Sequence, residues 1–158
     1  MNRAESFDAL IGYLYGQHVL TLCTGDSTSG TLWCANCFYV LDVKAMAFII
    51  MTDSDTRHGA MLQHCRFVAG TVNDQQPEVS QLQGVQYQGQ CRQLAGEALN
   101  NARALYLAQI PQAAAFSTPV WQIRLDEIKM TDNRRGFGTK IYWRRADEQR
   151  RQIASAGG

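Results

Sequence analysis

The sequence predicts a mainly β fold with added α, in which six or seven strands form a small antiparallel barrel with peripheral helices. Several short segments rich in β-branched and aromatic residues alternate apolar with polar side chains, and clusters of Gly, Asn, Asp and Pro separate them. Only two segments show helical spacing over more than three turns. At 158 residues, the chain is long enough to bury a core and is expected to form one domain, over residues 1–145.

The two long helices are expected at 4–15 and 96–110. In the first, Asn2 and Glu5 are placed as a capping box. Its apolar residues recur at helical spacing and are Phe7, Leu10, Ile11 and Leu14. The second ends at Pro111, because proline lacks the amide hydrogen that a helix needs. A shorter helix is expected from residue 57 to 64.

The strands are expected between these helices and after them. Segment 84–94 is typical of a half-buried strand, because apolar residues face one way while glutamines and an arginine face the other. Segment 73–83, which contains Pro77, is expected to be a loop. The predicted strands span residues 18–24, 31–42, 45–53, 66–73, 84–94, 121–133 and 140–144.

Charge and composition indicate which classes of binding partner and which cellular compartment to expect. A net charge of +1 gives no overall field for nucleic acid, so no nucleic-acid partner is expected. The longest apolar run is too short to span a membrane, and no signal-peptide region is present, which predicts a cytoplasmic protein. The basic cluster of Arg144, Arg145, Arg150 and Arg151 is interrupted by Asp147 and Glu148, and segment 146–158 is expected to be a flexible, solvated tail.

The five cysteines favour packing over metal binding or cross-linking. Their odd number, without a secretion signal, argues against a disulfide framework. Cys34 and Cys37 have the CxxC spacing, but they lie inside a predicted strand, where residues three apart face opposite sides. No second CxxC completes a tetrahedral zinc site. No metal is therefore expected, and reduced cysteines packed as small hydrophobic residues are the favoured interpretation.

The point where strand 45–53 gives way to helix 57–64 is the main candidate for function. Thr52 and Thr56 offer hydroxyl groups, Arg57 a two-pronged guanidinium and His58 an imidazole, beside a helix start that attracts anions. Together they could hold a phosphate group.

The same stretch also fits a helix start that binds nothing. In that interpretation Thr56 or Asp55 caps the helix, while Arg57 and His58 are solvated. The carboxylates of Asp53 and Asp55 favour it, since they repel a phosphate. Residue chemistry alone leaves both interpretations open.

A family resemblance bears on this choice. The order of segments from residue 18 to 94 resembles the FMN-binding split barrel of the pyridoxamine 5′-phosphate oxidase superfamily. There, an apolar residue and Thr end a strand, and Ser-Arg-Lys follows four residues later. Met51, Thr52, Thr56, Arg57 and His58 match this pattern, with histidine in place of lysine. The resemblance implies that Thr52 and Arg57 contact the FMN phosphate and that Thr56 assists. His58 weakens the clamp at neutral pH, because histidine is then largely uncharged.

The resemblance also implies which strands meet the flavin ring. Segment 36–41, beginning Asn36, Cys37 and Phe38, resembles the strand whose backbone runs beside the isoalloxazine. The strand that starts at Gly84 resembles a later one that also approaches the flavin. A homodimer with FMN sites between its subunits is implied, acting as a flavin-dependent oxidoreductase of unknown substrate. No catalytic residue is assigned.

More closely, nearly the whole chain resembles the YhbP-like family of uncharacterised split-barrel proteins. The resemblance rests on GQHV, LWCAN, TRH, AGTVN, GVQ, the run from TPVW through IRLDEIK to TDN, and GFG. Segment 131–143 has Arg134 and Arg135 but lacks the Arg-Leu-His-Asp-Arg type segment of the oxidases, which argues against vitamin-B6 oxidase activity.

Two rival functions remain at this point. One is a non-catalytic module that binds or senses flavin, deazaflavin or haem. The other is a cofactor-free dimer in which Asp53 and Asp55 have taken over the site. Outside that site, His18 is expected to be a hydrogen-bonded structural histidine. The loop around Phe137 is either a plain turn or a cover for a ring, and the turn is favoured.

Overall fold

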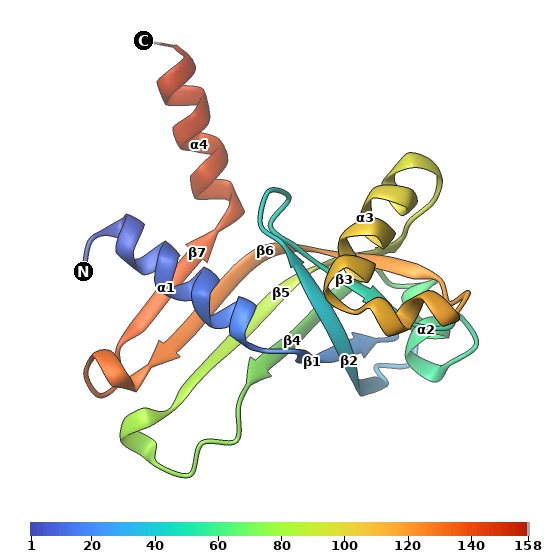
Figure 1. Ribbon diagram of the computed structural model, residues 1–158, viewed down its shortest axis with the longest axis horizontal. Helices are drawn as coiled ribbons and strands as arrows, with labels where there is room; N and C mark the ends of the chain where they lie inside the picture. The colour runs from blue at the N-terminus through green and yellow to red at the C-terminus, as the bar shows by residue number, and fades with distance from the viewer. Residues whose placement is uncertain (158) are drawn as a thin grey trace.

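The computed structural model describes residues 1–157, and Figure 1 shows them as one twisted sheet with helices at its ends and sides. The strands are β1 (Val19–Gly25), β2 (Leu32–Asp42), β3 (Ala47–Met51), β4 (Phe67–Asn73), β5 (Gln83–Gln93), β6 (Val120–Asp132) and β7 (Lys140–Arg144). The α-helices are α1 (Arg3–Gly16), α2 (Arg57–Leu62), α3 (Gly96–Gln109) and α4 (Arg145–Ala156). Short 3-10 turns are η1 (Val79–Gln81), η2 (Pro111–Ala115) and η3 (Asn133–Arg135).

All strand pairs are antiparallel, in the order β3-β2-β1-β4-β5-β6-β7. β3 also pairs with β6, which closes six strands into a barrel, and β7 adds a seventh strand beside β6. The predicted class is confirmed: mainly β with added α, as a six- to seven-stranded antiparallel barrel with peripheral helices. Strand ends differ from the sequence-based prediction by at most two residues.

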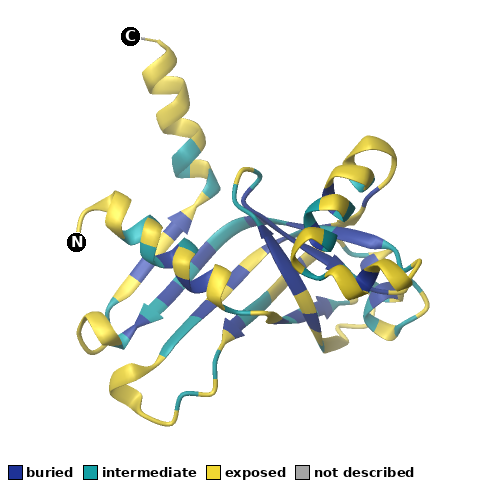
Figure 2. Cartoon of the chain, in the orientation of Figure 1, coloured by how far each residue is buried: buried dark blue, intermediate teal, exposed yellow. Residues whose placement is uncertain are grey.

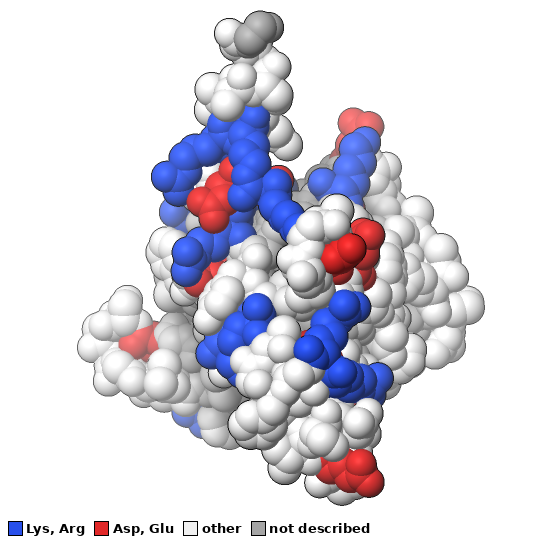
Figure 3. Space-filling view, turned by 90° about the vertical axis from the view of Figure 1, so that its left-hand side faces the viewer, with Lys and Arg blue, Asp and Glu red and all other residues white. Residues whose placement is uncertain are grey.

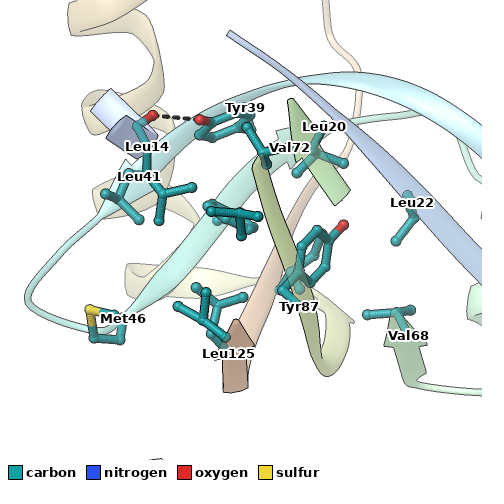
Figure 4. Close-up of a cluster of buried hydrophobic side chains, with 14 of the residues drawn as sticks. Leu14, Leu20, Leu22, Tyr39, Leu41, Met46, Val68, Val72, Tyr87 and Leu125 are labelled. Atoms are coloured by element: carbon teal, nitrogen blue, oxygen red, sulfur yellow. Dashed lines mark hydrogen bonds between the residues drawn. The ribbon is translucent and has the colours of Figure 1, made fainter. Parts of the chain in front are cut away.

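The barrel interior is filled by alternate side chains from its strands, as Figure 4 shows. The Phe48 ring packs between Tyr39 and Tyr87, with ring centroids 4.7 and 5.2 Å away. α1 closes one end of the barrel with Leu14, whose carbonyl accepts a hydrogen bond from the Tyr39 hydroxyl. This core fixes the strands on which the site is built.

A second apolar cluster lies outside the barrel, under α3. Ala102 and Tyr106 of α3 pack there against Val40 of β2, Ile49 of β3 and Val120 of β6. β3 is therefore buried on both faces, which explains why its sequence reads as an unbroken apolar run rather than an alternating one.

α4 is absent from the sequence-based prediction, which expected a flexible tail at 146–158. The structure has a helix over Arg145–Ala156 that projects away from the barrel (Figure 1) and buries no residue (Figure 2). The Arg145 guanidinium anchors its start by donating to the carbonyls of Leu125, Ala45 and Met46. Figure 3 shows basic and acidic side chains gathered side by side where this helix leaves the barrel, and one ion pair joins Arg3 of α1 to Glu148.

The cysteines divide into two groups. Cys37 and Cys91 are buried in the barrel core, as the packing interpretation predicts. Cys34 is exposed, so that interpretation is wrong for this residue, while Cys23 and Cys65 are half-buried. The predicted opposition of the CxxC pair is confirmed, since Cys34 faces out of the barrel and Cys37 faces in. Among residues 1–157, no helix is long and apolar enough to cross a membrane.

Candidate functional site

The connection from β3 to α2 is shaped by Thr56, which is the N-cap of the helix. Its Oγ1 accepts a hydrogen bond of 3.1 Å from the Gly59 amide and donates one of 2.8 Å to the Asp53 carbonyl. Gly59 is buried, and a Cβ atom there would lie 2.1 Å from the Asp53 carbonyl oxygen. Glycine is therefore required for this tight turn, which brings residues 52 and 58 together.

Thr52 and His58 form the centre of the site. The Thr52 Oγ1 lies 2.6 Å from His58 Nε2, and Thr56 Oγ1 lies 3.4 Å from the same nitrogen. The Thr52 amide donates to the Pro119 carbonyl at 3.1 Å, and its carbonyl accepts from the Trp121 indole at 3.0 Å. These bonds fix Thr52, which is only 8% exposed, against the start of β6.

Burial determines the charge of the histidine. The half-buried position of His58 lowers its pKa from the ordinary 6.5, because desolvation disfavours the charged imidazolium. We therefore expect a neutral imidazole at pH 7 in the unliganded protein. Thr52 and His58 form a neutral hydrogen-bonded pair that an approaching anion can polarise.

Arg57 is exposed and supplies the positive charge of the site. Its guanidinium carbon lies 4.0 Å from the centre of the Trp33 ring, on β2. Stacking uses the flat face of the guanidinium, so the N–H groups in its plane can still bind an anion. The carboxylates of Asp53 and Asp55 are exposed, and their side chains make none of the hydrogen bonds that hold this turn.

An apolar groove of about 490 Å³ lies where β3 leads into this polar cluster, although Thr52, Thr56, Arg57 and His58 do not line it. Met51 lines the groove and immediately precedes Thr52, while Thr118 lines it and precedes Pro119. The volume is in the range of small-molecule sites in proteins. The other lining residues include His18, Phe38, Tyr106, Ile110 and Phe116.

The contribution of α3 and η2 to this groove was missed in the sequence. Tyr106, Ile110 and Phe116 carry no motif, and their spacing indicates only an amphipathic helix followed by a loop. They reach the groove because α3 packs across β2 and β3. His18 is exposed at the groove, not buried in the hydrogen-bonded structural position expected for it.

The three predicted residues of β2 lie on its two faces. Asn36 and Phe38 face outward, where the Asn36 Oδ1 accepts a hydrogen bond of 3.1 Å from the Thr21 hydroxyl. Phe38, 61% exposed, lines the groove. The Cys37 side chain points into the barrel, where burial raises the pKa of its thiol to about 11. Only the backbone of Cys37 can therefore meet a ligand in the groove.

Gly84 is not brought to this cluster within one subunit. Gly84 is the second residue of β5, opposite Asn73 and Thr131. Gln93, at the other end of β5, pairs with Trp121, whose indole binds the Thr52 carbonyl. Gly84 and Gln93 are roughly 30 Å apart along the strand. The loop around Phe137, which is 84% exposed, lies at the Gly84 end as well, because Thr131 pairs with Lys140.

Other parts of the molecule are weaker candidates for a ligand or metal site. A larger hollow of about 650 Å³ lies between α1 and α4, beside the Arg3–Glu148 ion pair, and contains none of the predicted site residues. Across residues 1–157, no group of three or more His, Cys, Asp or Glu side chains is arranged to hold a metal ion.

Solved structures of other proteins share this fold. A heme binding protein of Mycobacterium smegmatis superposes with a TM-score of 0.72 at 21% identity, covering 91% of this chain and 58% of that one. An FAD-binding protein of Mesorhizobium loti superposes with a TM-score of 0.62 at 9% identity, covering 82% of this chain and 94% of that one. These similarities confirm the split-barrel fold and, at such identities, nothing finer.

Sequence relatives are much closer. No family model matches the chain. A UPF0306 protein of Photorhabdus laumondii is 48% identical over 145 residues, which cover 92% of this chain and all of the relative. The UPF0306 protein YhbP of Escherichia fergusonii is 47% identical over 142 residues, covering 90% of this chain and 95% of that one. The resemblance to YhbP is therefore confirmed, and the chain belongs to the UPF0306 family.

Proposed function

We propose that the protein is an FMN-binding member of the pyridoxamine 5′-phosphate oxidase-like superfamily and acts as a flavin-dependent oxidoreductase. One observation carries the proposal: an apolar groove of about 490 Å³ is lined by Met51, which directly precedes Thr52 of the polar cluster that contains Arg57. FMN matches both parts: its phosphate would suit the polar cluster, and its flat, largely apolar ring system would suit the groove.

In this proposal the polar cluster holds the phosphate. The Thr52 hydroxyl donates one hydrogen bond, and the Arg57 guanidinium, swung from its stacked position on Trp33, donates two charge-assisted ones. A phosphate dianion nearby favours the imidazolium form of His58, which opposes the effect of burial on its pKa. Thr56 keeps the turn closed by capping α2.

The groove takes the ring. Phe38, Met51 and Tyr106 supply apolar surface that excludes water. Asn36, on the same outward face of β2 as Phe38, supplies a polar side chain. Bound FMN supplies the hydride chemistry, and the protein binds, orients and shields it. His18 lines the groove and is placed to meet a substrate there.

We propose further that the functional form is a homodimer with the sites between its subunits. The rim of the groove is apolar and open: Phe38 and Phe116 are each 61% exposed, and Val19, which pairs with Phe38, is 40% exposed. A second copy of the chain would cover this rim. A dimer would also account for Gly84, which lies roughly 30 Å away along its own strand, because a twofold partner can bring its own Gly84 to the site.

Haem is the second candidate, and one observation favours it. His18 is exposed in a groove whose other walls are largely apolar, and a neutral imidazole is a common ligand of haem iron. The fold similarity to the heme binding protein of Mycobacterium smegmatis is compatible with this alternative.

The absorbance spectrum of the freshly purified protein, followed by separate titrations with FMN and with haemin, tests the choice. We expect saturable FMN binding with flavin bands that shift on binding, in wild type and in a His18→Ala variant. Haem binding that is lost in His18→Ala, without FMN binding, would favour the second candidate. Binding of neither would leave the cofactor-free dimer. Reduction of bound FMN by a nicotinamide cofactor then separates an enzyme from a binding module.

A further inference from the structure

Two thiols that face the outside of the barrel lie against each other. Cys23 of β1 and Cys34 of β2 are direct partners across the β1–β2 hairpin, and their Sγ atoms are 2.6 Å apart. Cys34 is exposed and Cys23 half-buried. Neither side chain belongs to the polar cluster or lines the groove described above.

The strand register makes this contact close. The Tyr39 amide donates to the His18 carbonyl, and the Asp26 amide donates to the Thr31 carbonyl, so hydrogen-bonded pairs fall at every second position between them. Cys23 and Cys34 fall between those positions, in a non-hydrogen-bonded pair. Such pairs have Cα atoms about 4.5 Å apart and the closest side chains, within the separations that disulfides span.

The two thiols differ in their surroundings. The hydrogen bond with Cys34, together with burial, raises the pKa of the Cys23 thiol, so Cys23 keeps its proton and can donate it to the Cys34 sulfur. Cys34, exposed and hydrogen-bonded, is the thiol that a reagent in solution meets first. By contrast, burial raises the pKa of Cys37 to about 11 and that of Cys91 to about 12, which leaves both inert.

We propose that Cys23 and Cys34 form a redox-active dithiol that closes to a disulfide by exchange with low-molecular-weight disulfides of the glutathione type. The Cys34 thiolate attacks one sulfur of the small disulfide and bonds to it, while the other sulfur leaves as a thiolate and takes up the proton that Cys34 lost. Cys23 then loses its proton and attacks the Cys34 sulfur of the mixed disulfide, releasing the second small thiol. Two protein thiols are oxidised to one disulfide, and one small disulfide is reduced to two thiols.

The fold is expected to accommodate both states. The strands are already paired on either side of the two cysteines, at Leu22 with Ala35 and at Thr24 with Trp33. The sulfurs therefore need only a short movement to reach bonding distance, and no strand has to shift register. The inference stands whether or not the protein binds a flavin.

Mass spectrometry after exposure to glutathione disulfide tests the proposal on the folded, full-length protein. Reduced protein is incubated with glutathione disulfide, remaining thiols are alkylated, and peptides are mapped. We expect an intramolecular Cys23–Cys34 disulfide, reversed by dithiothreitol. In Cys23→Ser, which lacks the second thiol, we expect glutathione to accumulate at Cys34 instead.

Cys65→Ser is the matched control, because Cys65 is also half-buried but its sulfur contacts only the Phe67 carbonyl, at 3.9 Å. This variant should form the disulfide at the wild-type rate, while Cys34→Ser should form neither disulfide nor mixed disulfide at Cys23 under the same conditions. The proposal is wrong if the wild-type protein stays fully reduced, or if Cys23→Ser takes up no glutathione at Cys34. A disulfide that joins any other pair would also overturn it.

Discussion

Thr52 Oγ1 and His58 Nε2 lie 2.6 Å apart across the turn that joins β3 to α2. This bond links Thr52, which the barrel holds in place, to the first turn of α2. His58 stands where the superfamily pattern that the chain resembles has a lysine. Because His58 is half-buried and neutral, the site is charged chiefly through Arg57. The pair therefore makes the site sensitive to pH in a way that a lysine would not.

The stability of the unliganded protein is expected to depend on His58 at mildly acidic pH. Burial lowers the pKa of His58 below 6.5, so the unfolded chain binds this proton more readily than the folded one. The free energy of unfolding should thus fall as the pH drops below about 6.5 and through the lower, folded-state pKa.

Urea unfolding at pH 8 and pH 5 measures this dependence. His58→Gln should lose part of the acid sensitivity, while His64→Gln, a change at an exposed histidine just after α2, should keep all of it. Equal pH dependence in wild type and His58→Gln would show that the imidazole is not desolvated.

Thr52→Val is expected to weaken FMN binding by about five-fold. The change keeps the shape of the side chain and removes one neutral hydrogen bond, worth roughly 1 kcal/mol. Thr24→Val is the control, because Thr24 is also buried and its hydroxyl donates to the Trp33 carbonyl, outside the cluster. Isothermal titration with FMN should detect a loss only in Thr52→Val. Equal FMN affinity in both variants would contradict a phosphate contact at Thr52.

Much of the fold follows from local sequence patterns, and the site follows in part. Apolar and polar residues alternate in segment 84–94, and segment 45–53 contains an unbroken apolar run. Both patterns predict strands, and the structure confirms them. The sequence offered Thr56 or Asp55 as the N-cap of the short helix, and the structure has Thr56. The stacking of Arg57 on Trp33 joins residues of different elements and depends on the closure of the barrel, which no local pattern encodes.

Long-range packing explains what the sequence did not show. The α4 helix is anchored by Arg145, which binds carbonyls about 20 and 100 residues earlier in the chain. The aromatic wall formed by Tyr106 and Phe116 depends on where α3 packs. Gly84 is separated from the Thr52–His58 cluster by the length of β5 within one subunit. The resemblance placed both in one site because it implies a dimer, in which the second subunit contributes to the site.

Cys37→Ala is expected to lower the free energy of unfolding by about 1–2 kcal/mol while the fold is kept. The buried thiol packs as a small hydrophobic side chain, so its removal leaves a small cavity. Cys34→Ala, at an exposed position of the same CxxC pair, should change stability by less than about 0.5 kcal/mol. Denaturant unfolding under reducing conditions compares the two. Stoichiometric zinc in wild type that is absent from Cys37→Ala would overturn the packing role.

The protein is expected to be a homodimer at micromolar concentration. A stable dimer of this kind would bury on the order of 2,000 Å² or more in total. Phe116→Glu places a charge on the exposed rim of the groove and should shift the equilibrium to monomers, whereas Ile153→Glu, at a position 74% exposed on the projecting α4, should not. Light scattering measures the mass. A monomeric wild type would contradict the dimer, and equal effects of both changes would contradict this interface.

Arg57 provides the most direct test of the phosphate site, because FMN and riboflavin differ only by the phosphate. Two charge-assisted hydrogen bonds are worth roughly 1.5–3 kcal/mol, which corresponds to about 10- to 150-fold in affinity. Arg57→Lys should recover only part of this, since a point charge replaces a planar fork. Arg66→Ala is the matched control, because Arg66 is another exposed arginine stacked on an aromatic ring, that of Phe67 at 5.2 Å.

The decisive measurement is the ratio of FMN to riboflavin affinity in wild type, Arg57→Ala and Arg66→Ala, obtained by titration under one set of conditions. We predict that Arg57→Ala lowers this ratio by about 10- to 150-fold with riboflavin affinity nearly unchanged, and that Arg66→Ala leaves it at the wild-type value. If Arg57→Ala binds FMN as tightly as wild type, or loses riboflavin as severely as FMN, the cluster at Thr52–His58 does not hold the phosphate.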